Sequence, residues 1–258
     1  MTLSPWALRA LVNFDLLVAP FNDQLLFDCI DRTLKLIGGV SASPTWALSN
    51  HDTPRLVSRI GAEEARAMAL FTFGLPGSCY VFQGQELGLP DAELNDHDRQ
   101  DPAFFRTNGT QKGRDGARVP LPWNGSQTPF GFTAGRPWLP IPQEWIDLSV
   151  AAETGDISSS LEMYRTALAL RKDFLRDEND FQWTQTPDRS GIISYRRGKI
   201  EIFLNTSDSP RTLSTMGEHL ISSCAIERHN GEIVLNAHAC VWVHTLNPPK
   251  FVSRNLLS

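Results

Sequence analysis

The chain has 258 residues, of which 41% are hydrophobic, 21% charged and 9% aromatic. These fractions are ordinary for a globular protein and exclude a largely disordered or collagen-like chain. The formal net charge is −5, and because lysines and arginines are scattered rather than clustered, a nucleic-acid-binding surface is excluded as well.

The first third of the chain alternates strands and helices. Apolar residues at helical spacing predict one helix over residues 21–37 and a second over residues 63–73, whose first turn is acidic. Short apolar runs predict strands at residues 11–16, 45–49 and 78–82. The order strand, helix, strand, helix, strand is typical of a parallel sheet.

Periodicity disappears between residues 84 and 145, where Pro, Gly, Trp, Asp and Arg dominate. A segment this long without periodicity is uncommon in a compact protein unless it is functional. Helical spacing returns over residues 158–174, which start with three serines suited to capping and end near two basic residues, Arg171 and Lys172.

Short β-rich runs follow that helix and are separated by turn residues. They are residues 180–183, 191–196, 199–205, 219–226 and 240–245. The dipeptide Arg197-Gly198 between two of them predicts a hairpin. We therefore expect a boundary near residue 178 and a small antiparallel β domain over residues 179–258.

The four cysteines stand far apart and form neither a CxxC pair nor a Cys/His spacing typical of metal sites. This usage predicts reduced, mostly buried thiols in a cytoplasmic protein, and the sequence calls for no metal and no cofactor. The apolar run of residues 6–20 is interrupted by Arg9, Asn13 and Asp15, so it predicts neither a signal peptide nor a membrane span.

Three polar residues that could take part in catalysis follow the predicted strand at residues 45–49: Asn50, His51 and Asp52. The carboxyl ends of parallel strands face the active site in barrels and doubly wound sheets. A carboxylate beside an imidazole can bind sugar hydroxyls and stabilise positive charge in a glycosyl transition state. Taken alone the pair is weak evidence, because an aspartate in such a loop is more often a cap.

Two further segments carry candidate residues. Residues 113–123 read Gly-Arg-Asp-Gly-Ala-Arg-Val-Pro-Leu-Pro-Trp, a combination of planar donors and an aromatic ring that suits a sugar site. An ion-paired loop around a buried tryptophan is the alternative reading. Glu86, within residues 83–88, is either a site carboxylate or the structural partner of an arginine.

The ordered set of motifs is more specific than any single one. Asn-His-Asp after a strand is followed by Leu-Pro-Gly, Tyr-x-x-Gln-Gly-Gln-Glu-Leu-Gly, the loop of residues 113–123 and Tyr-Arg-x-x-Leu-x-Leu-Arg. In this combination, residues 12–174 resemble the carboxyl-terminal half of an α-glucosidase of the α-amylase superfamily, the retaining glycoside hydrolases that include oligo-1,6-glucosidases. The β tail resembles that family's C-terminal domain.

The resemblance implies an α/β plus all-β fold. Its first part, residues 1–178, would be a partial TIM-barrel catalytic domain with strands six to eight of a (β/α)8 barrel and a long substrate loop at residues 84–145. By position, Asp52 matches the carboxylate that stabilises the transition state, His51 a histidine that binds hydroxyls of the sugar at the cleaved bond, and Arg118 an arginine that contacts the same sugar. The implied substrate is an α-gluco-oligosaccharide of the maltose or isomaltose type.

The family's nucleophile lies in a Gly-x-Arg-x-Asp context after strand four and its acid/base glutamate lies after strand five. Neither context occurs in this sequence, and the family assigns no catalytic role to Asp15 or Glu86. Retaining hydrolysis needs two carboxyl groups about 5 Å apart. We therefore expect a truncated or split α-glucosidase, inactive alone, that an upstream polypeptide would complete.

Two alternatives stay open. The chain could be a non-catalytic carbohydrate-binding or interaction module that uses Asp52, Arg118 and Trp123 to hold sugar without cleaving it. It could also be part of a transglycosylating relative such as a trehalose synthase, although the Asn-His-Asp-Thr-Pro-Arg and Arg-Val-Pro-Leu-Pro-Trp motifs favour the α-glucosidases.

Overall fold

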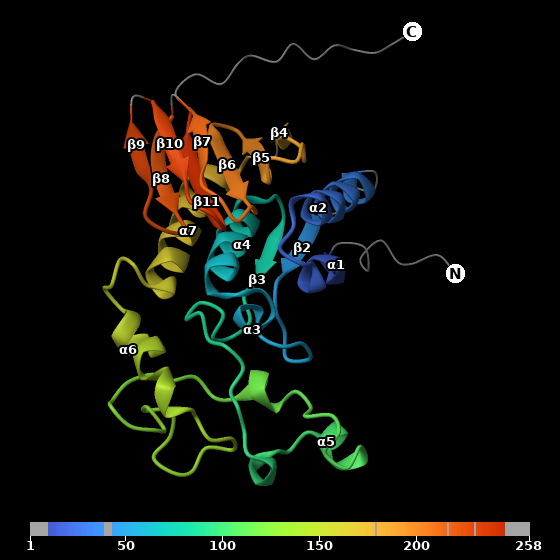
Figure 1. The fold of residues 1–258 in the computed structure, drawn as a ribbon, viewed down its shortest axis with the longest axis vertical. Helices are drawn as coiled ribbons and strands as arrows, with labels where there is room; N and C mark the ends of the chain where they lie inside the picture. The colour runs from blue at the N-terminus through green and yellow to red at the C-terminus, as the bar shows by residue number, and fades with distance from the viewer. Residues whose placement is uncertain (1–9, 39–42, 179, 216, 230, 246–258) are drawn as a thin grey trace.

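The computed structural model describes residues 10–38, 43–178, 180–215, 217–229 and 231–245. Figure 1 shows a short parallel sheet with its helices beside two antiparallel sheets, while the long middle segment forms a lobe at the opposite end of the molecule.

Three parallel strands form the first sheet, in the order β1 (Ala10–Asn13), β2 (Ser43–Ala47) and β3 (Ser78–Tyr80). The helices predicted at residues 21–37 and 63–73 are present as α2 (Asp23–Gly38) and α4 (Ala62–Gly74), and each lies between two neighbouring strands. The expected parallel sheet is therefore confirmed. Parallel neighbours require such crossover connections.

The first predicted strand is too long. Only residues 10–13 are extended, and residues 14–16 belong to a one-turn helix, α1 (Phe14–Val18). Leu16 and Leu17 are both buried while Phe14 and Val18 are exposed. Two adjacent buried residues fit a helix turn and not the alternation of a half-buried strand. The prediction of one strand over residues 11–16 was therefore wrong in its second half, because a short apolar run does not by itself distinguish a strand from a buried helical turn.

A further short helix, α3 (Leu56–Ile60), precedes α4. Residues 67–74 of helix α4 are all buried, because the helix packs against α3, α7 (Ser160–Leu175) and two strands of the five-stranded antiparallel sheet. The second half of the helix is apolar on nearly every side, which is stable only in such a position. Its last carbonyl groups accept hydrogen bonds from the guanidinium groups of Arg171 and Arg197, so the buried helix end keeps its polar groups paired.

The middle segment contains only short helical turns: η1 (Asp96–Asp98), α5 (Pro102–Arg106), η2 (Asp115–Arg118), η3 (Gln143–Leu148) and α6 (Val150–Glu153). The predicted loss of periodicity is confirmed. The segment nevertheless encloses its own apolar cluster, whose fully buried members include Leu87, Val119 and Phe130. It is thus a packed lobe and not a loose loop.

Eight antiparallel strands follow α7. They are β4 (Gln182–Gln185), β5 (Ile192–Arg197), β6 (Ile200–Asn205), β7 (Arg211–Ser214), β8 (Glu218–Ser222), β9 (Glu227–His229), β10 (Glu232–Leu235) and β11 (Ala239–His244). One sheet has the order β4-β5-β6-β11-β8 and the other β7-β10-β9. The hairpin at Arg197-Gly198 is confirmed as the β5–β6 connection. Three strands, β7, β9 and β10, were not predicted, because they are only three or four residues long and β9 is entirely exposed.

The five-stranded sheet is buried on both faces. Along β11, Cys240 and Trp242 face the cluster around α4, whereas Val241 and Val243 face the three-stranded sheet. The Trp242 indole N–H donates to the carbonyl of Leu70 in α4 at 3.1 Å. The antiparallel strands and the α/β part therefore share one core.

No helix in the described ranges combines the length and apolar character that crossing a bilayer would require. All four cysteines are free thiols, with Cys29 and Cys240 buried and Cys79 and Cys224 half-buried.

Candidate active site

The loop after β2 presents two polar side chains to solvent. Asn50 Oδ1 accepts hydrogen bonds from the backbone N–H groups of Asp52 at 2.8 Å and Thr53 at 3.0 Å. Such a side-chain turn fixes the loop backbone locally. His51 and Asp52 consequently project from the carboxyl end of β2, and half of the Asp52 side-chain surface is exposed.

The three residues singled out from the sequence lie together. Arg118 Nη2 donates to Asp52 Oδ1 at 2.9 Å, and Arg118 Nε donates to the carbonyl of His51 at 2.9 Å. The His51 ring nitrogen Nε2 lies 3.4 Å from Asp52 Oδ2. Asp52 and Arg118 are 66 residues apart in the sequence, so the contact is made entirely by the fold.

Sequence reasoning missed Arg114 as a member of this site. Arg114 Nη1 donates to Asp52 Oδ1 at 2.6 Å, and its Nε donates to Asp101 Oδ2 at 2.7 Å. The pKa of the Arg114 guanidinium is raised, first by its hydrogen bond to Asp101 and further by Asp52. The available signal was the presence of Arg114 in the same motif as Arg118: Arg114 immediately precedes the η2 turn that carries Arg118, and both guanidinium groups reach Asp52 Oδ1.

Asp101 has no exposed side-chain surface and is held on several sides. Its Oδ1 accepts from the backbone N–H of Ala103, and Asp115 Oδ2 accepts from the backbone N–H groups of both Gln100 and Asp101. The hydrogen bond from Arg114 and that from Ala103 hold the pKa of the Asp101 carboxyl well below its ordinary value. A side chain at Gly113, where φ is +75°, would approach Asp101 Cβ to 2.6 Å, so the backbone here tolerates only glycine.

The buried residue Arg55 forms hydrogen bonds to two other segments that surround the site. Its backbone N–H donates to Asp91 Oδ1 at 2.8 Å and its Nη1 to the carbonyl of Gln83 at 2.6 Å. Its guanidinium also lies over the rings of Phe82 and Trp145. Burial lowers the pKa of Arg55 to about 10, against the opposing charges of Asp91 and Glu86.

Other candidate residues have different surroundings. Trp123 is 45% exposed, so the alternative of a buried tryptophan is wrong. Trp138, which was not predicted from the sequence as a site residue, is 62% exposed, and its indole N–H donates to the carbonyl of Arg118 at 3.1 Å. Asp15 lies in α1 and pairs with Arg32. Burial raises the pKa of Glu86, whose Oε2 has no hydrogen-bond partner in the described part of the chain.

This arrangement can hold a ligand rich in hydroxyl groups. One partly exposed carboxylate, two guanidinium groups and an imidazole offer acceptors and planar donors at the same place. The other carboxylate of the network, Asp101, is buried and committed to Arg114, so it is not available for attack on a substrate. Across residues 10–38, 43–178, 180–215, 217–229 and 231–245, no group of three or more His, Cys, Asp or Glu side chains could hold a metal ion.

Residues 12–178 match the family described as the alpha amylase catalytic domain. A protein of Rhizobium meliloti (strain 1021) named "Probable alpha-glucosidase" is 37% identical over 176 residues, which are 65% of this chain and 32% of that protein. An oligo-1,6-glucosidase of Parageobacillus thermoglucosidasius is 34% identical over 149 residues, 48% of this chain and 26% of that protein.

Among solved structures, an alpha-glucosyl transfer enzyme superposes with a TM-score of 0.71 at 30% identity, over 90% of this chain and 45% of that one. The chain thus spans roughly a quarter to a third of the length of these sequence relatives. The similarity confirms the expected fold class, the C-terminal part of a (β/α)8 barrel followed by antiparallel β structure. The chain belongs to the α-amylase catalytic-domain family.

Proposed function

We propose that this chain supplies part of the active site of an α-glucosidase that acts on α-linked gluco-oligosaccharides of the maltose or isomaltose type. In this assignment Asp52 stabilises the positive charge that develops on the sugar at the cleaved bond, while His51 and Arg118 bind hydroxyl groups of the same sugar. The charge stabilisation follows from the oxocarbenium-like transition state of glycoside hydrolysis.

One observation carries the proposal. A single oxygen, Asp52 Oδ1, accepts hydrogen bonds from both Arg114 and Arg118, at 2.6 and 2.9 Å, while half of the Asp52 side chain remains exposed. The carboxylate is therefore held in one orientation, and its exposed part faces solvent at the carboxyl end of β2. Fixed charges of this kind accelerate a reaction because they need no reorganisation at the transition state.

The nucleophile and the acid/base must come from elsewhere. The 258-residue sequence lacks the family contexts of both groups, and two carboxyl groups about 5 Å apart are required for retention. We propose that they reside on a polypeptide carrying the other barrel strands, whether or not it is continuous with this sequence. The exposed Phe14, Tyr80 and Val81 on or beside the parallel sheet are apolar surface that such a polypeptide would cover.

Glucose release from maltose and isomaltose tests the proposal. We expect no release by the folded 258-residue chain alone, and release when it is co-expressed with a polypeptide bearing the first five barrel strands of a family member. Asp52→Asn in that complex should lower kcat by about 100-fold to 1,000-fold, the usual effect of removing one charge-stabilising group. Hydrolysis by the isolated chain that Asp52→Asn abolishes would contradict the incomplete site, and an active complex unaffected by Asp52→Asn would contradict the role of Asp52.

Transfer of glucose to another sugar is a second candidate. It is favoured by the similarity to the alpha-glucosyl transfer enzyme, which extends over 90% of this chain. Product analysis of the completed enzyme separates the two candidates, since hydrolysis of maltose yields glucose alone, whereas transfer to a second sugar also yields isomeric or longer saccharides.

A non-catalytic sugar-binding module is tested by titrating the chain with maltose and following tryptophan fluorescence. Saturable quenching without any activity of the completed enzyme would favour the module. The cytoplasmic location and the division at residue 178 stay predictions from the sequence.

A further inference from the structure

Two arginines hold the Asp52 carboxylate, and they are anchored in different parts of the molecule. Arg118 Nε donates to the carbonyl of His51 at 2.9 Å, so this arginine is tied to the loop that carries Asp52 itself. Arg114 is tied to the packed lobe, where its Nε donates to Asp101 Oδ2 at 2.7 Å and its backbone N–H donates to the same oxygen at 2.9 Å. Arg114 therefore links Asp52 to a separate part of the fold.

The anchor at Asp101 is fixed on its own side. Its side chain has no exposed surface, and its Oδ1 accepts from the backbone N–H of Ala103 at 2.9 Å. Asp115 Oδ2 accepts from the backbone N–H groups of Gln100 and Asp101, at 2.8 and 2.9 Å. The Arg114 side chain, by contrast, is 41% exposed. Because a buried, multiply bonded carboxylate moves less than an exposed arginine, Asp101 fixes the position of the Arg114 guanidinium.

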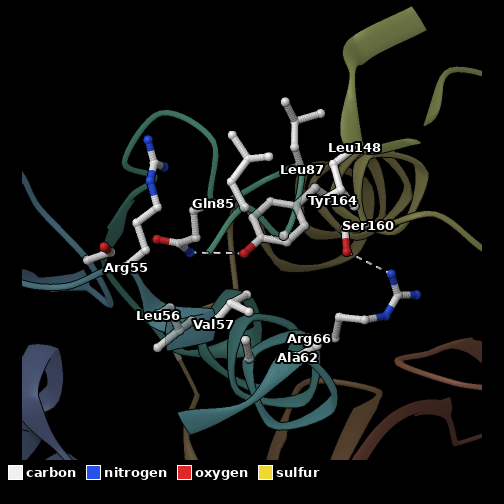
Figure 2. Close-up of a pocket in the computed structure, with 14 residues that line it drawn as sticks. Arg55, Leu56, Val57, Ala62, Arg66, Gln85, Leu87, Leu148, Ser160 and Tyr164 are labelled. Carbon is white, nitrogen blue, oxygen red and sulfur yellow. Dashed lines mark hydrogen bonds between the residues drawn. The ribbon is translucent and has the colours of Figure 1, made fainter. Parts of the chain in front are cut away.

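The ends of the loop that carries Asp52 are held without these two residues. Ser49 and Arg55 stand at the two ends and line a cavity of about 110 Å³ (Figure 2). The other walls come mainly from α3, the starts of α4 and α7 and the segment after β3, and neither Asp101 nor Arg114 lines the cavity. Arg114 and Asp101 therefore act on the side chain of Asp52 and not on the course of its loop.

The Asp52 side chain needs such support because half of its surface is exposed. Packing alone does not select one staggered rotamer for a side chain in this position. Arg114 and Arg118 both donate to Asp52 Oδ1, at 2.6 and 2.9 Å, which fixes the rotamer and the twist of the carboxylate. Ordering a free arginine side chain costs conformational entropy, and the bond to Asp101 offsets that cost for Arg114.

The formal charges of the network cancel when Asp101 is included. Ionised Asp52 and Asp101 carry two negative charges, and Arg114 and Arg118 carry two positive ones. Without the charge of Asp101, one negative charge would stand against two positive ones. The sugar cleaved by a glycosidase becomes positive in the transition state, so an excess of positive charge beside it would raise the barrier.

We propose that Asp101 is a positioning residue of the active site, which acts through Arg114 to hold the Asp52 carboxylate in one rotamer and to balance the charge beside it. This role rests on the proposed function, because it supports the charge stabilisation assigned to Asp52. Asp101 is buried and touches no substrate. Its removal weakens an interaction made in the transition state and should therefore change kcat more than KM.

Three-bond Hα–Hβ couplings of Asp52, measured by NMR in the full 258-residue chain, test the positioning without any activity. We expect couplings of a single χ1 rotamer in the native chain and rotamer-averaged couplings in Asp101→Asn. Asp98→Asn is the matched control, because Asp98 lies in the same lobe, is 9% exposed and pairs with Arg136. It should leave the Asp52 couplings unchanged. A single Asp52 rotamer in Asp101→Asn, or equal averaging in Asp98→Asn, would overturn the proposal.

Arg114→Lys tests the same link without altering a buried group. Lysine keeps the charge, but it has no planar fork with which to bridge two carboxylates. We expect averaged Asp52 couplings in this variant as well, and no further averaging when Asp101→Asn is added, because both substitutions cut one connection. Averaging that increases further in the double variant would show that Asp101 acts by another route and would refute the proposal.

The enzyme completed with the other barrel strands tests the consequence for the reaction. Asp101→Asn should lower kcat by about tenfold to 100-fold, less than Asp52→Asn, and should leave KM for maltose nearly unchanged. An unchanged kcat, or a rise in KM alone, would overturn the role of Asp101. If the native complex released no glucose, the proposed function would fail, while the NMR couplings would still decide whether Asp101 positions Asp52.

Discussion

Arg114 Nε lies 2.7 Å from Oδ2 of Asp101, a carboxylate with no exposed side-chain surface. The same guanidinium reaches Asp52 at 2.6 Å. A buried carboxylate, fixed by the cap of α5 and by the Asp115 turn, thereby determines where a surface arginine holds the candidate catalytic aspartate. The orientation of Asp52 is set from the packed lobe and not only from its own loop.

Asp101 should make the protein acid-sensitive. Its pKa is depressed by the hydrogen bonds from Arg114 and Ala103, so its contribution to stability is fully present above the unfolded value of about 3.9 and is lost as the pH falls below it. We expect Asp101→Asn to lower the melting temperature at neutral pH and to flatten its decline below about pH 4. Thermal unfolding followed by circular dichroism across this range measures both. If the melting temperature of the variant fell as steeply below about pH 4 as that of the native chain, Asp101 would not be the source of the acid sensitivity.

Glu153 should make the protein less stable as the pH rises, the opposite of the effect of Asp101. It lies where its Oε2 accepts from the backbone N–H of Leu161 at 2.8 Å, and burial, opposed by Arg66, raises its pKa to about 7. The folded protein therefore holds a proton that the unfolded chain loses near pH 4.3, and stability falls as the pH rises from there through about 7.

Glu153→Gln keeps an acceptor for Leu161 and removes the charge. Its free energy of unfolding should equal that of the native chain in acid and exceed it by about 1–3 kcal/mol at alkaline pH, measured by urea denaturation. Glu162, whose pKa is lowered by its bond from the Gly155 N–H, is the comparison: Glu162→Gln should destabilise at neutral pH. A Glu153→Gln variant less stable than the native chain at alkaline pH would show that its charged form is favoured.

Arg55 should be a large determinant of stability. Replacing it by methionine removes the Nη1 donor to the Gln83 carbonyl and a buried positive charge that opposes Asp91 and Glu86, which should cost about 3–5 kcal/mol. Arg55→Lys keeps the charge but cannot reproduce the planar fork, so we expect an intermediate loss. Arg136, an exposed arginine 3.4 Å from Asp98, is the matched control, and Arg136→Met should change the free energy of unfolding by less than about 0.5 kcal/mol. Equal effects at the two sites would contradict the tethering role of Arg55.

At Gly74 the end of α4 lies close to the five-stranded sheet. A Cβ there would lie 2.3 Å from Tyr195 Oη and 2.5 Å from Ile202 Cδ1. Gly74→Ala should destabilise the chain by about 1–3 kcal/mol through overpacking, although alanine is intrinsically the better helix former. Gly38→Ala, at the end of α2 with no atom within 4 Å, should be neutral.

A double-mutant cycle checks the cause. Tyr195→Phe alone loses the hydrogen bond to the Phe71 carbonyl, but in the Gly74→Ala background it also removes the clashing oxygen. The two effects should therefore be less than additive in urea denaturation, and strict additivity would place the strain elsewhere.

The sequence by itself determined the elements whose signals are local. Helices α2 and α4 and strands β2 and β3 have periodicity or apolar runs that needed no tertiary context, and the motif order identified the family. His51, Asp52 and Arg118 were selected together because each matches a motif position. Strands β7, β9 and β10 escaped prediction because strands of only three or four residues are defined mainly by their backbone partners.

Only the tertiary structure decided how the aperiodic residues 84–145 fold back onto the site. The bond between Arg114 and Asp101 joins residues 13 apart within a segment that has no repeating pattern, and the cavity beside Ser49 is formed by four separate segments. Such contacts depend on packing across long chain separations, for which hydrophobic periodicity carries no information. The sequence thus identified which groups are available, while packing decided which of them meet.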